Sequence, residues 1–393
     1  MRSADRFARV RRGSAFASTS FGAWRKVRVT VIGGGALGSR LAAEIVRSGA
    51  RVLVIDPDVI EVANIGTQGH DAASVGRTKV DAIVAACDAI ECDRAAGLVC
   101  DVRAVGCGIL AMTDLLVDCT DDPALAHPLA LLSNGLSLPL VRLAVDGSGQ
   151  RELGRVSVSH GGGGHACQLC TYTPADLAAG VTTPCPAGAA QRGPTLASAG
   201  TALTGVGLGL LTIQRLLAGS DAASVLDREL HVDLDGMGVH ALQLARAERC
   251  LSGHEAFDAV SLPATVHDLS LRGLLQRGRD ALGVNAITLT FQNAPFSLEA
   301  RCGCGERKLQ TRCVWAPPLT CPACGGAMRW RRDVALASID AEQACVLRVL
   351  DEPLAALGVP DGALVTARGV GVHPARFVLS VAASPFTHRG VHP

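Results

Sequence analysis

The feature that most constrains this chain is an apolar run near its N-terminus that ends in a cluster of glycines. Residues 27–32 read VRVTVI, a β-branched run typical of a buried parallel strand. Gly33, Gly35 and Gly38 follow at the spacing of a phosphate-binding turn. In such a turn the first glycine permits the bend, the second admits phosphate to the backbone, and the third lets the helix pack on the strand. The helix N-terminus that follows suits an anion.

The second half of the same unit follows directly. Apolar residues recur at helical spacing from Leu37 to Val46, and Gly49 is placed to end that helix. Residues 51–55 form a second apolar strand, and Asp56 comes next, where a carboxylate suits a ribose hydroxyl. Glycine-rich packing is the alternative, since the chain holds 44 glycines. Because strand, turn, helix, strand and acid agree in register, we predict an α/β fold with a Rossmann-like, mostly parallel sheet flanked by helices.

Further segments resemble the ThiF/MoeB/HesA family, the ubiquitin-activating-like adenylyltransferases. The resemblance rests on DPDVIEVANIGTQ and VGRTKVDAI after the second strand and on DLLVDCTDDPALAHPLA further along, and it runs from residue 5 to residue 255. It implies an enzyme that uses ATP to activate the C-terminal carboxylate of a ubiquitin-like or sulfur-carrier protein, a small β-grasp protein, as an acyl-adenylate with release of pyrophosphate. It also implies a homodimer, with transfer onto a thiol of this chain or of a downstream enzyme.

The resemblance assigns ATP-site roles to individual residues of this chain. The glycines would line the phosphates, and Asp56 would bind the ribose. Asp121 would hold Mg²⁺ near the α-phosphate, where fixed cations offset the negative charge that builds during adenylation. The remaining nucleotide-binding residues that the resemblance implies are Asp58, Asn64, Gln68 and Lys79. The alternatives are that Lys79 is a solvated lysine at a helix start and that Asp121 is a helix N-cap.

Two further residues carry expected catalytic roles. Arg9 resembles an arginine finger on an N-terminal arm that reaches the other subunit, although an exposed arm residue is the alternative. Cys185 matches a loop cysteine that some family members use for thioester or persulfide chemistry. Its setting, TTPCPAG, has no adjacent lysine or arginine to lower its pKa, and the alternative is a dispensable loop cysteine, as in other family members.

The chain also departs from the family pattern. Thr67 and Ala126 stand where the family usually carries phosphate-facing arginines, and Asp122 replaces the usual asparagine. These departures motivate a second hypothesis, a catalytically weakened member that serves as a binding scaffold. The glycines and Asp56 would also allow an NAD(P)-dependent oxidoreductase, but no catalytic histidine or Tyr–Lys pair occurs at a useful spacing.

Fifteen cysteines without a secretory signal favour metal sites in a reducing, cytoplasmic setting over a disulfide framework. The family commonly has a structural zinc after the central strands. Here the resemblance implies a site of Cys167, Cys170, Cys250 and His254, three thiolates and one imidazole, which zinc accepts. An ordinary surface histidine is the alternative for His254.

A second cysteine group lies further along the chain. Cys302-x-Cys304 and Cys321-x-x-Cys324, separated by a short β-like segment, are typical of a zinc ribbon with a closed, structural site of four cysteines. The alternative is a pair of reduced turn cysteines. Cys313 lies between the two pairs and is interpreted as a bystander.

Composition narrows the classes of partner. The 37 basic and 36 acidic residues leave a net charge of +1, and aromatic residues make up 3%, so neither electrostatics nor stacking favours nucleic acid. Leu196–Leu217 is apolar, but it is crowded with glycine and threonine and contains Gln214 and Arg215. We interpret it as a buried helix and expect no membrane span.

Three domains are expected. Residues 1–25 form an arm, 26–255 the ThiF-type adenylation domain, and 256–393 a small α+β module that contains the zinc ribbon at 300–326. In the module we predict a helix at 268–283, a strand at 286–291, and a final helix-turn-strand-strand unit from residue 353. The strands predicted in the adenylation domain are Val27–Ile32, Arg51–Ile55, Leu98–Val102, Leu115–Val117, Leu138–Ala144 and Arg155–Ser159.

Overall fold

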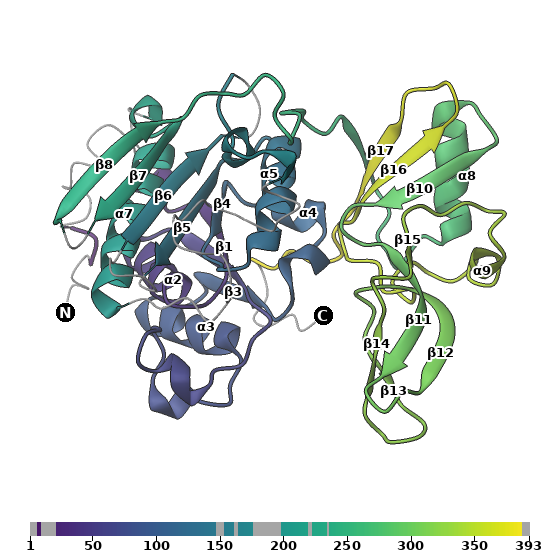
Figure 1. Cartoon of the computed structure of the whole chain (residues 1–393), viewed down its shortest axis with the longest axis horizontal. Helices are drawn as coiled ribbons and strands as arrows, with labels where there is room; N and C mark the ends of the chain where they lie inside the picture. Colours follow the sequence, from purple (N-terminus) through teal and green to yellow (C-terminus); the bar gives the residue numbers. More distant parts are fainter. Residues whose placement is uncertain are drawn as a thin grey trace. The chain divides into compact units, whose positions relative to one another are not determined.

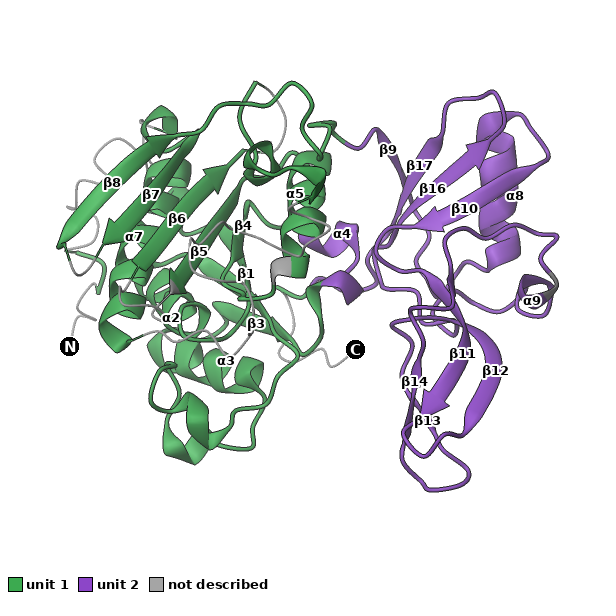
Figure 2. Ribbon diagram, viewed as in Figure 1, with its two compact units in different colours: residues 1–102, 111–256, 385–393 green, residues 103–110, 257–384 purple. Residues whose placement is uncertain are grey.

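The computed structural model describes residues 6–8, 21–146, 153–160, 164–175, 198–218, 222–233 and 236–386. The chain divides into two compact units, shown in different colours in Figure 2. Unit 1 comprises residues 1–102, 111–256 and 385–393, and unit 2 comprises residues 103–110 and 257–384.

Unit 1 is built on an eight-stranded sheet in the described part of the chain, with strand order β3-β2-β1-β4-β5-β6-β7-β8 (Figure 1). The first five strands in this order are parallel, and β5 to β8 are antiparallel. The predicted Rossmann-like, mostly parallel sheet is therefore confirmed. The strands are β1 (Arg28–Ile32), β2 (Arg51–Ile55), β3 (Ala95–Leu98), β4 (Leu115–Asp118), β5 (Leu140–Asp146), β6 (Leu153–Ser159), β7 (Arg228–Asp233) and β8 (Gly238–Gln243).

Helices cover both faces of this sheet. Helices α2 (Gly38–Ser48), α3 (Lys79–Ile90) and α7 (Ala199–Ala218) share one hydrophobic core with the valine-rich face of the strands, whereas α5 (Ala126–Gly135) packs beside η7 (Gln168–Thr171). The short α1 (Phe21–Trp24) precedes β1. Helix α2 ends as predicted at Gly49, which has φ +108° and donates its N–H to Ile45 O and Val46 O.

Helix α7 is long and apolar enough to span a membrane by length and composition alone. In this structure half of that apolar window is buried, and the helix shares the core of α2 and the sheet. Its hydrophobicity is thus accounted for by packing in unit 1, as the sequence predicts.

One strand lies earlier than predicted. Ala95–Leu98 forms β3, in register with Val52–Ile55, while the segment from Val102 to Ala104 is a 3-10 helix, so the predicted strand at Leu98–Val102 is wrong. Alanine and glycine have a low preference for strands, whereas the segment LVCDV contains two valines, which have a high one. Strand preference alone therefore places the strand too late in the chain. The pairing with β2 overrides the local preference.

Unit 2 contains a four-stranded sheet in the order β10-β16-β17-β9, whose core is shared with α8 (Leu271–Leu282). A second sheet has the order β12-β11-β14-β13, with β15 paired to β11. The short helix α9 (Ala344–Leu347) completes the unit. The strands are β9 (Ala259–Leu262), β10 (Ile287–Phe291), β11 (Phe296–Cys302), β12 (Arg307–Cys313), β13 (Leu319–Thr320), β14 (Ala327–Trp330), β15 (Ala335–Leu336), β16 (Leu364–Gly369) and β17 (Ala375–Leu379).

Helix α8 confirms the predicted amphipathic helix, with Ser270 as its N-cap and Gly283 in the left-handed region as its C-cap. The helix predicted from residue 353 is wrong, because this segment forms turns. Pro353 bridges Ser270, and Gly358, at φ +77°, lies so close to Ala316 that a Cβ would be 2.4 Å away. A segment this short does not overcome the cost of helix nucleation.

Residues 103–110 belong to unit 2, although they connect β3 to β4 of unit 1 in the chain. They include the one-turn helix α4 (Cys107–Leu110). The N–H of Gly108 donates to Gly362 O at 2.8 Å, and a Cβ at Gly106 would lie 2.0 Å from Asp361 O. Glycine is therefore required at position 106 by this close backbone approach.

Candidate functional site

The glycine turn joins β1 to α2, and its three predicted glycines differ in their surroundings. Gly33 has φ +92°, and a Cβ at Gly38 would lie 1.8 Å from the Gly33 carbonyl oxygen. A Cβ at Gly35 would meet no atom within 4 Å. Gly33 and Gly38 are therefore required by the fold, whereas Gly35 borders open space of the kind a bound phosphate needs. Their role in lining phosphates stays a prediction.

Asp56 anchors this turn from the end of β2. Its carboxylate is almost fully buried and accepts the N–H of Gly34 at 2.6 Å and the N–H of Asp58 at 2.7 Å. Burial raises the pKa of Asp56, an effect opposed by these hydrogen bonds and by the charge of Lys79. Each carboxylate oxygen has a second lone pair, so a ribose hydroxyl remains an acceptable donor.

Lys79 begins α3 and lies beside the glycine turn. A Cβ built at Gly34 would be 3.3 Å from Lys79 Cβ, and the ammonium group pairs with Asp58 Oδ2 at 2.7 Å. The α3 N-terminus is capped by Thr78, whose hydroxyl accepts the N–H of Asp81. The Lys79 side chain is only 10% exposed, so the alternative of a solvated lysine at a helix start is not supported.

Lys79 also lines a polar pocket of about 250 Å³ whose other lining residues are Asp58, Val59, Glu61 and Asn64. Asn64 is fixed there because its Oδ1 accepts the N–H of Glu61 at 2.9 Å. The structure thus brings three of the predicted nucleotide-binding residues, Lys79, Asp58 and Asn64, into one pocket. A phosphate bound there would compete with Asp58 for the ammonium group.

Gln68 follows this pocket in the chain, one turn after Asn64. Its N–H bonds to Asn64 O at 2.8 Å, and its buried side-chain oxygen Oε1 has no hydrogen-bond partner among the described residues. A buried acceptor without a donor is costly. A bound hydroxyl, amino group or water would satisfy it, so Gln68 fits the predicted polar ligand.

The third part of the candidate site follows β4. Asp118 is fully buried. Its Oδ1 accepts the N–H of Thr120 at 2.9 Å and the Thr120 hydroxyl at 2.7 Å. Its Oδ2 forms an ion pair with Arg142 at 3.3 Å. This network shapes the loop that carries Asp121, which is exposed. An exposed carboxylate at the carboxyl end of a parallel strand suits Mg²⁺, whereas the buried Asp118 suits a structural role.

Three residues near the site were missed by sequence reasoning. Arg40 of α2 donates to Thr67 O at 2.6 Å and to Gln68 O at 3.2 Å. His70 places Nε2 3.2 Å from Gly34 O, and burial lowers the pKa of this half-buried histidine, which favours a neutral ring with a proton on Nε2. Arg142, within the apolar run LPLVRLAV, carried the clearest signal, because a charge inside a buried strand needs a partner.

Two of the predicted catalytic residues cannot be placed. Arg9 and Cys185 lie outside the described residues, as do all of residues 9–20 and 176–197. Their expected roles therefore stay predictions from the resemblance.

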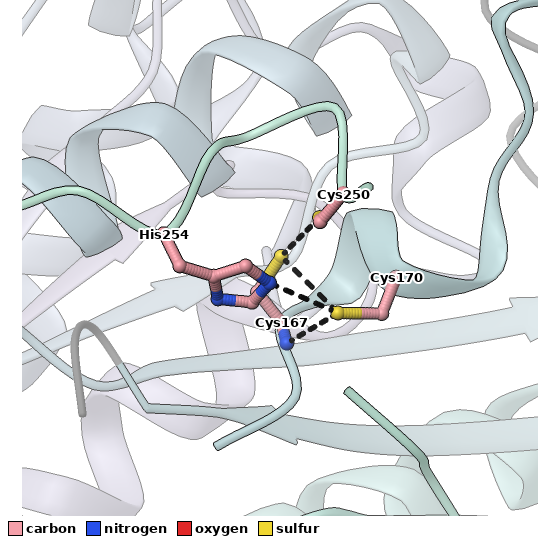
Figure 3. Close-up of side chains that lie close together, drawn as sticks. All are labelled: Cys167, Cys170, Cys250 and His254. Carbon is pink, nitrogen blue, oxygen red and sulfur yellow. Dashed lines mark hydrogen bonds between the residues drawn. The ribbon is translucent and has the colours of Figure 1, made fainter. Parts of the chain in front are cut away.

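The first predicted metal centre is assembled in unit 1 (Figure 3). Cys167 Sγ lies 3.5 Å from Cys250 Sγ and 4.0 Å from Cys170 Sγ, and Cys170 Sγ is 3.2 Å from His254 Nε2. Four ligand atoms that lie within 4.8 Å of one another match the tetrahedron of a zinc ion, in which sulfurs are roughly 3.8 Å apart.

The surroundings of this group also favour a cation. Burial raises the pKa of the Cys167 thiol to about 12, whereas hydrogen bonds, chiefly from Ser252, outweigh burial and lower the pKa of Cys250. A bound metal would hold both as thiolates. Gly253 and His254 both have positive φ, +69° and +54°, a turn that directs the imidazole into the cluster. His254 is 9% exposed, which does not support an ordinary surface histidine.

The second predicted metal centre is assembled in unit 2, at the tip of the β11–β14 sheet. Cys302 Sγ is 3.4 Å from Cys324 Sγ, and Cys304 Sγ is 3.6 Å from Cys321 Sγ, with all four sulfurs within 4.8 Å of one another. Cys313 is fully buried in the neighbouring hydrophobic core and does not join them, as expected. Four thiolates with no open position would hold zinc structurally.

The sequence model of the ThiF family matches residues 9–252. A search of curated proteins by sequence returned no match.

Solved structures are similar to part of this chain. Escherichia coli MccB with MccA-N7isoAsn has a TM-score of 0.50 at 15% identity, over 59% of this chain and 69% of that chain. The same enzyme with ATP gives 0.49 at 14% identity, over 59% and 68%, and PaaA gives 0.44 at 15% identity, over 57% and 66%. At this identity the likeness concerns the fold alone.

Proposed function

Because this chain belongs to the ThiF family of adenylyltransferase-like enzymes, we propose that it uses ATP to activate the C-terminal carboxylate of a ubiquitin-like or sulfur-carrier protein. The product would be an acyl-adenylate, with pyrophosphate released. The observation that carries the proposal is Lys79, held almost buried beside the glycine turn and at the wall of a polar pocket with Asp58 and Asn64.

The chemistry needs charge stabilisation more than proton transfer. A carboxylate oxygen attacks the α-phosphorus, the bond from that phosphorus to the bridging oxygen breaks, and pyrophosphate leaves with the electron pair. Lys79 would exchange Asp58 for a phosphate oxygen, and the backbone of the glycine turn would contact the phosphates. Mg²⁺ near Asp121 would neutralise charge on the phosphate oxygens.

The nucleotide half of the proposal is tested without knowledge of the carrier. Calorimetric titration of the zinc-replete protein with Mg-ATP is expected to show saturable binding that is lost in Lys79→Ala, with NADH as the comparator. The matched control is Lys26→Ala, since Lys26 is an exposed lysine before β1. Preference for NADH would favour the oxidoreductase hypothesis. Binding of neither nucleotide would favour the scaffold hypothesis.

The adenylation half is tested by ATP–pyrophosphate exchange. Exchange is expected only when a carrier with a free C-terminal carboxylate is added, and both Lys79→Ala and Asp121→Ala should abolish it. Full exchange in both variants would refute the site assignment. Amidation of the carrier's C-terminus should also abolish exchange, because it removes the attacking oxygen.

A short peptide is the second candidate substrate. Unit 1 shares its fold with E. coli MccB, which binds its peptide substrate MccA. Replacing the carrier in the exchange assay by peptides with a free C-terminal carboxylate separates the two substrate classes. Exchange with peptides and none with carrier proteins would favour this candidate.

A further inference from the structure

Three arginines stand side by side on the sheet that carries the second cysteine cluster. Arg301 of β11 is in register with Arg307 of β12 on one side and with Arg329 of β14 on the other. Paired positions on neighbouring strands project to the same face, and all three residues are exposed. Like charges directly opposite one another destabilise a sheet. The repulsion within this row would be relieved by an anionic partner.

The sheet neutralises only part of this charge. Glu299, two residues before Arg301 on the same strand, pairs with Arg307 and with Arg331, the latter at 3.6 Å. The Arg301 and Arg329 side chains form no hydrogen bond or ion pair with a residue that the structure describes, although the charge of Arg301 is among the causes that lower the pKa of Asp333. From residue 296 to 336 the chain has seven basic and three acidic residues, so the excess of positive charge is local.

The same face offers an apolar contact and a sheet edge. Leu309 is opposite Glu299 in the register, and it is 79% exposed. It lies on β12, which ends the strand order of this sheet. At the C-terminal end of β12, the N–H of Cys313 already donates to Leu357 O. At the other end of the strand, residues 307–309 are exposed. An extended polypeptide can add to such an edge and place alternate side chains beside Arg307 and Leu309, the members of this face that lie on the edge strand.

Nucleic acid fits this face less well. Trp330 is 8% exposed with its Nε1 bonded to Pro317 O, and Trp315 is covered by Arg332 at 4.1 Å from the ring centroid. Among the described residues no aromatic ring is therefore presented for stacking by the row of arginines, a feature that single-stranded nucleic acid usually needs. Carboxylates pair with guanidinium groups in a bidentate manner and need no such ring.

We propose that the face formed by Arg301, Arg307, Leu309 and Arg329 binds an acidic, extended segment of the polypeptide that the adenylation domain activates. This inference rests on the proposed function for the identity of the partner. The cysteine cluster would then serve to hold the three strands in register, so that the three arginines stay side by side on one face.

The test is fluorescence anisotropy with the full-length, zinc-loaded protein and no nucleotide. The probe is a labelled peptide of alternating glutamate and valine; a lysine–valine peptide and a single-stranded DNA oligomer are comparators. The acidic peptide should bind with an affinity that falls as salt rises. The double variant R301Q/R329Q should weaken binding about tenfold, at about threefold per exposed pair. The control Arg277→Gln, an exposed arginine of α8, should leave it unchanged.

The inference is overturned if the double variant binds the peptide as tightly as wild type, if no acidic peptide binds, or if only the oligomer binds. Should the double variant lose zinc, the single variants decide, each with an expected threefold loss and a normal zinc content. Peptide binding without pyrophosphate exchange would refute the proposed function alone. Exchange without peptide binding would refute this inference alone.

Discussion

Substitution of alanine at two glycines of the turn separates a ligand contact from a packing requirement. In Gly38→Ala the new methyl group would lie 1.8 Å from the Gly33 carbonyl oxygen, more than 1 Å inside normal contact. The backbone must shift, and overpacking of this kind typically costs about 1–3 kcal/mol. In Gly35→Ala the methyl group meets nothing within 4 Å, and φ is not left-handed. Stability should therefore be unchanged or rise by about 0.4–1 kcal/mol, because the unfolded chain loses freedom.

The two variants should respond in opposite ways in two assays. Urea unfolding should show a lower midpoint for Gly38→Ala and a wild-type or higher midpoint for Gly35→Ala, with equal slopes. Calorimetry with Mg-ATP should show Gly35→Ala weakened at least about tenfold, equivalent to about 1.4 kcal/mol, since its methyl group fills space assigned to phosphate. The matched control is Gly207→Ala in α7, which also meets no atom within 4 Å and should leave ATP binding intact.

Two results would refute this reasoning. A stable Gly35→Ala variant with wild-type ATP affinity would show that the open space beside Gly35 does not receive the nucleotide. A Gly38→Ala variant with unchanged stability would show that the turn relaxes without cost, and the fold would then place no demand on that position.

The remaining predictions concern the metal centres and acid stability. His254→Ala should lower the zinc content of the purified protein from two ions to one, whereas His254→Cys should keep two, because zinc accepts four thiolates. The same zinc content in both variants would contradict the assignment. Cys321→Ser should likewise remove one zinc, and Cys313→Ser should remove none. The arginine partners lower the pKa of Glu299, so its contribution to stability is present above about pH 4, the unfolded value, and is lost as pH falls through the folded pKa. In urea unfolding, Glu299→Gln should thus differ from wild type at pH 7 and converge with it in acid; a constant difference would refute this.

Elements that carry strong local signals were predictable from the sequence. The glycine turn, β1, β2, α2 and α8 combine apolar periodicity with terminal glycines. The second cysteine cluster follows from ligand spacing, whereas the first was implied by the resemblance to the ThiF family. The register of β3 was not predictable, because its Ala-Ala-Gly sequence has little strand preference and its position is set by pairing with β2.

The candidate site was predictable only where the resemblance to the ThiF family assigns a role to a particular residue. Lys79, Asp58 and Asn64 were identified and lie in one pocket. The contacts of Arg40 with Thr67 O and Gln68 O were not predictable. They join residues distant in sequence, and a backbone oxygen accepts a hydrogen bond whatever the residue type. The same holds for His70 on the Gly34 carbonyl oxygen.

The assignment of residues 103–110 to unit 2 has a consequence for the order in which the chain matures on the ribosome. The strands β1 to β4 emerge early and can pair, but the loop between β3 and β4 finds the carbonyl oxygen of Gly362 only after most of the remaining chain has been translated. At about 5–20 residues per second this is a wait of roughly 10–50 s. During that interval the N–H of Gly108 lacks the carbonyl oxygen that it finally bonds, so this connection reaches its native contacts long after the strands on either side of it have been synthesised.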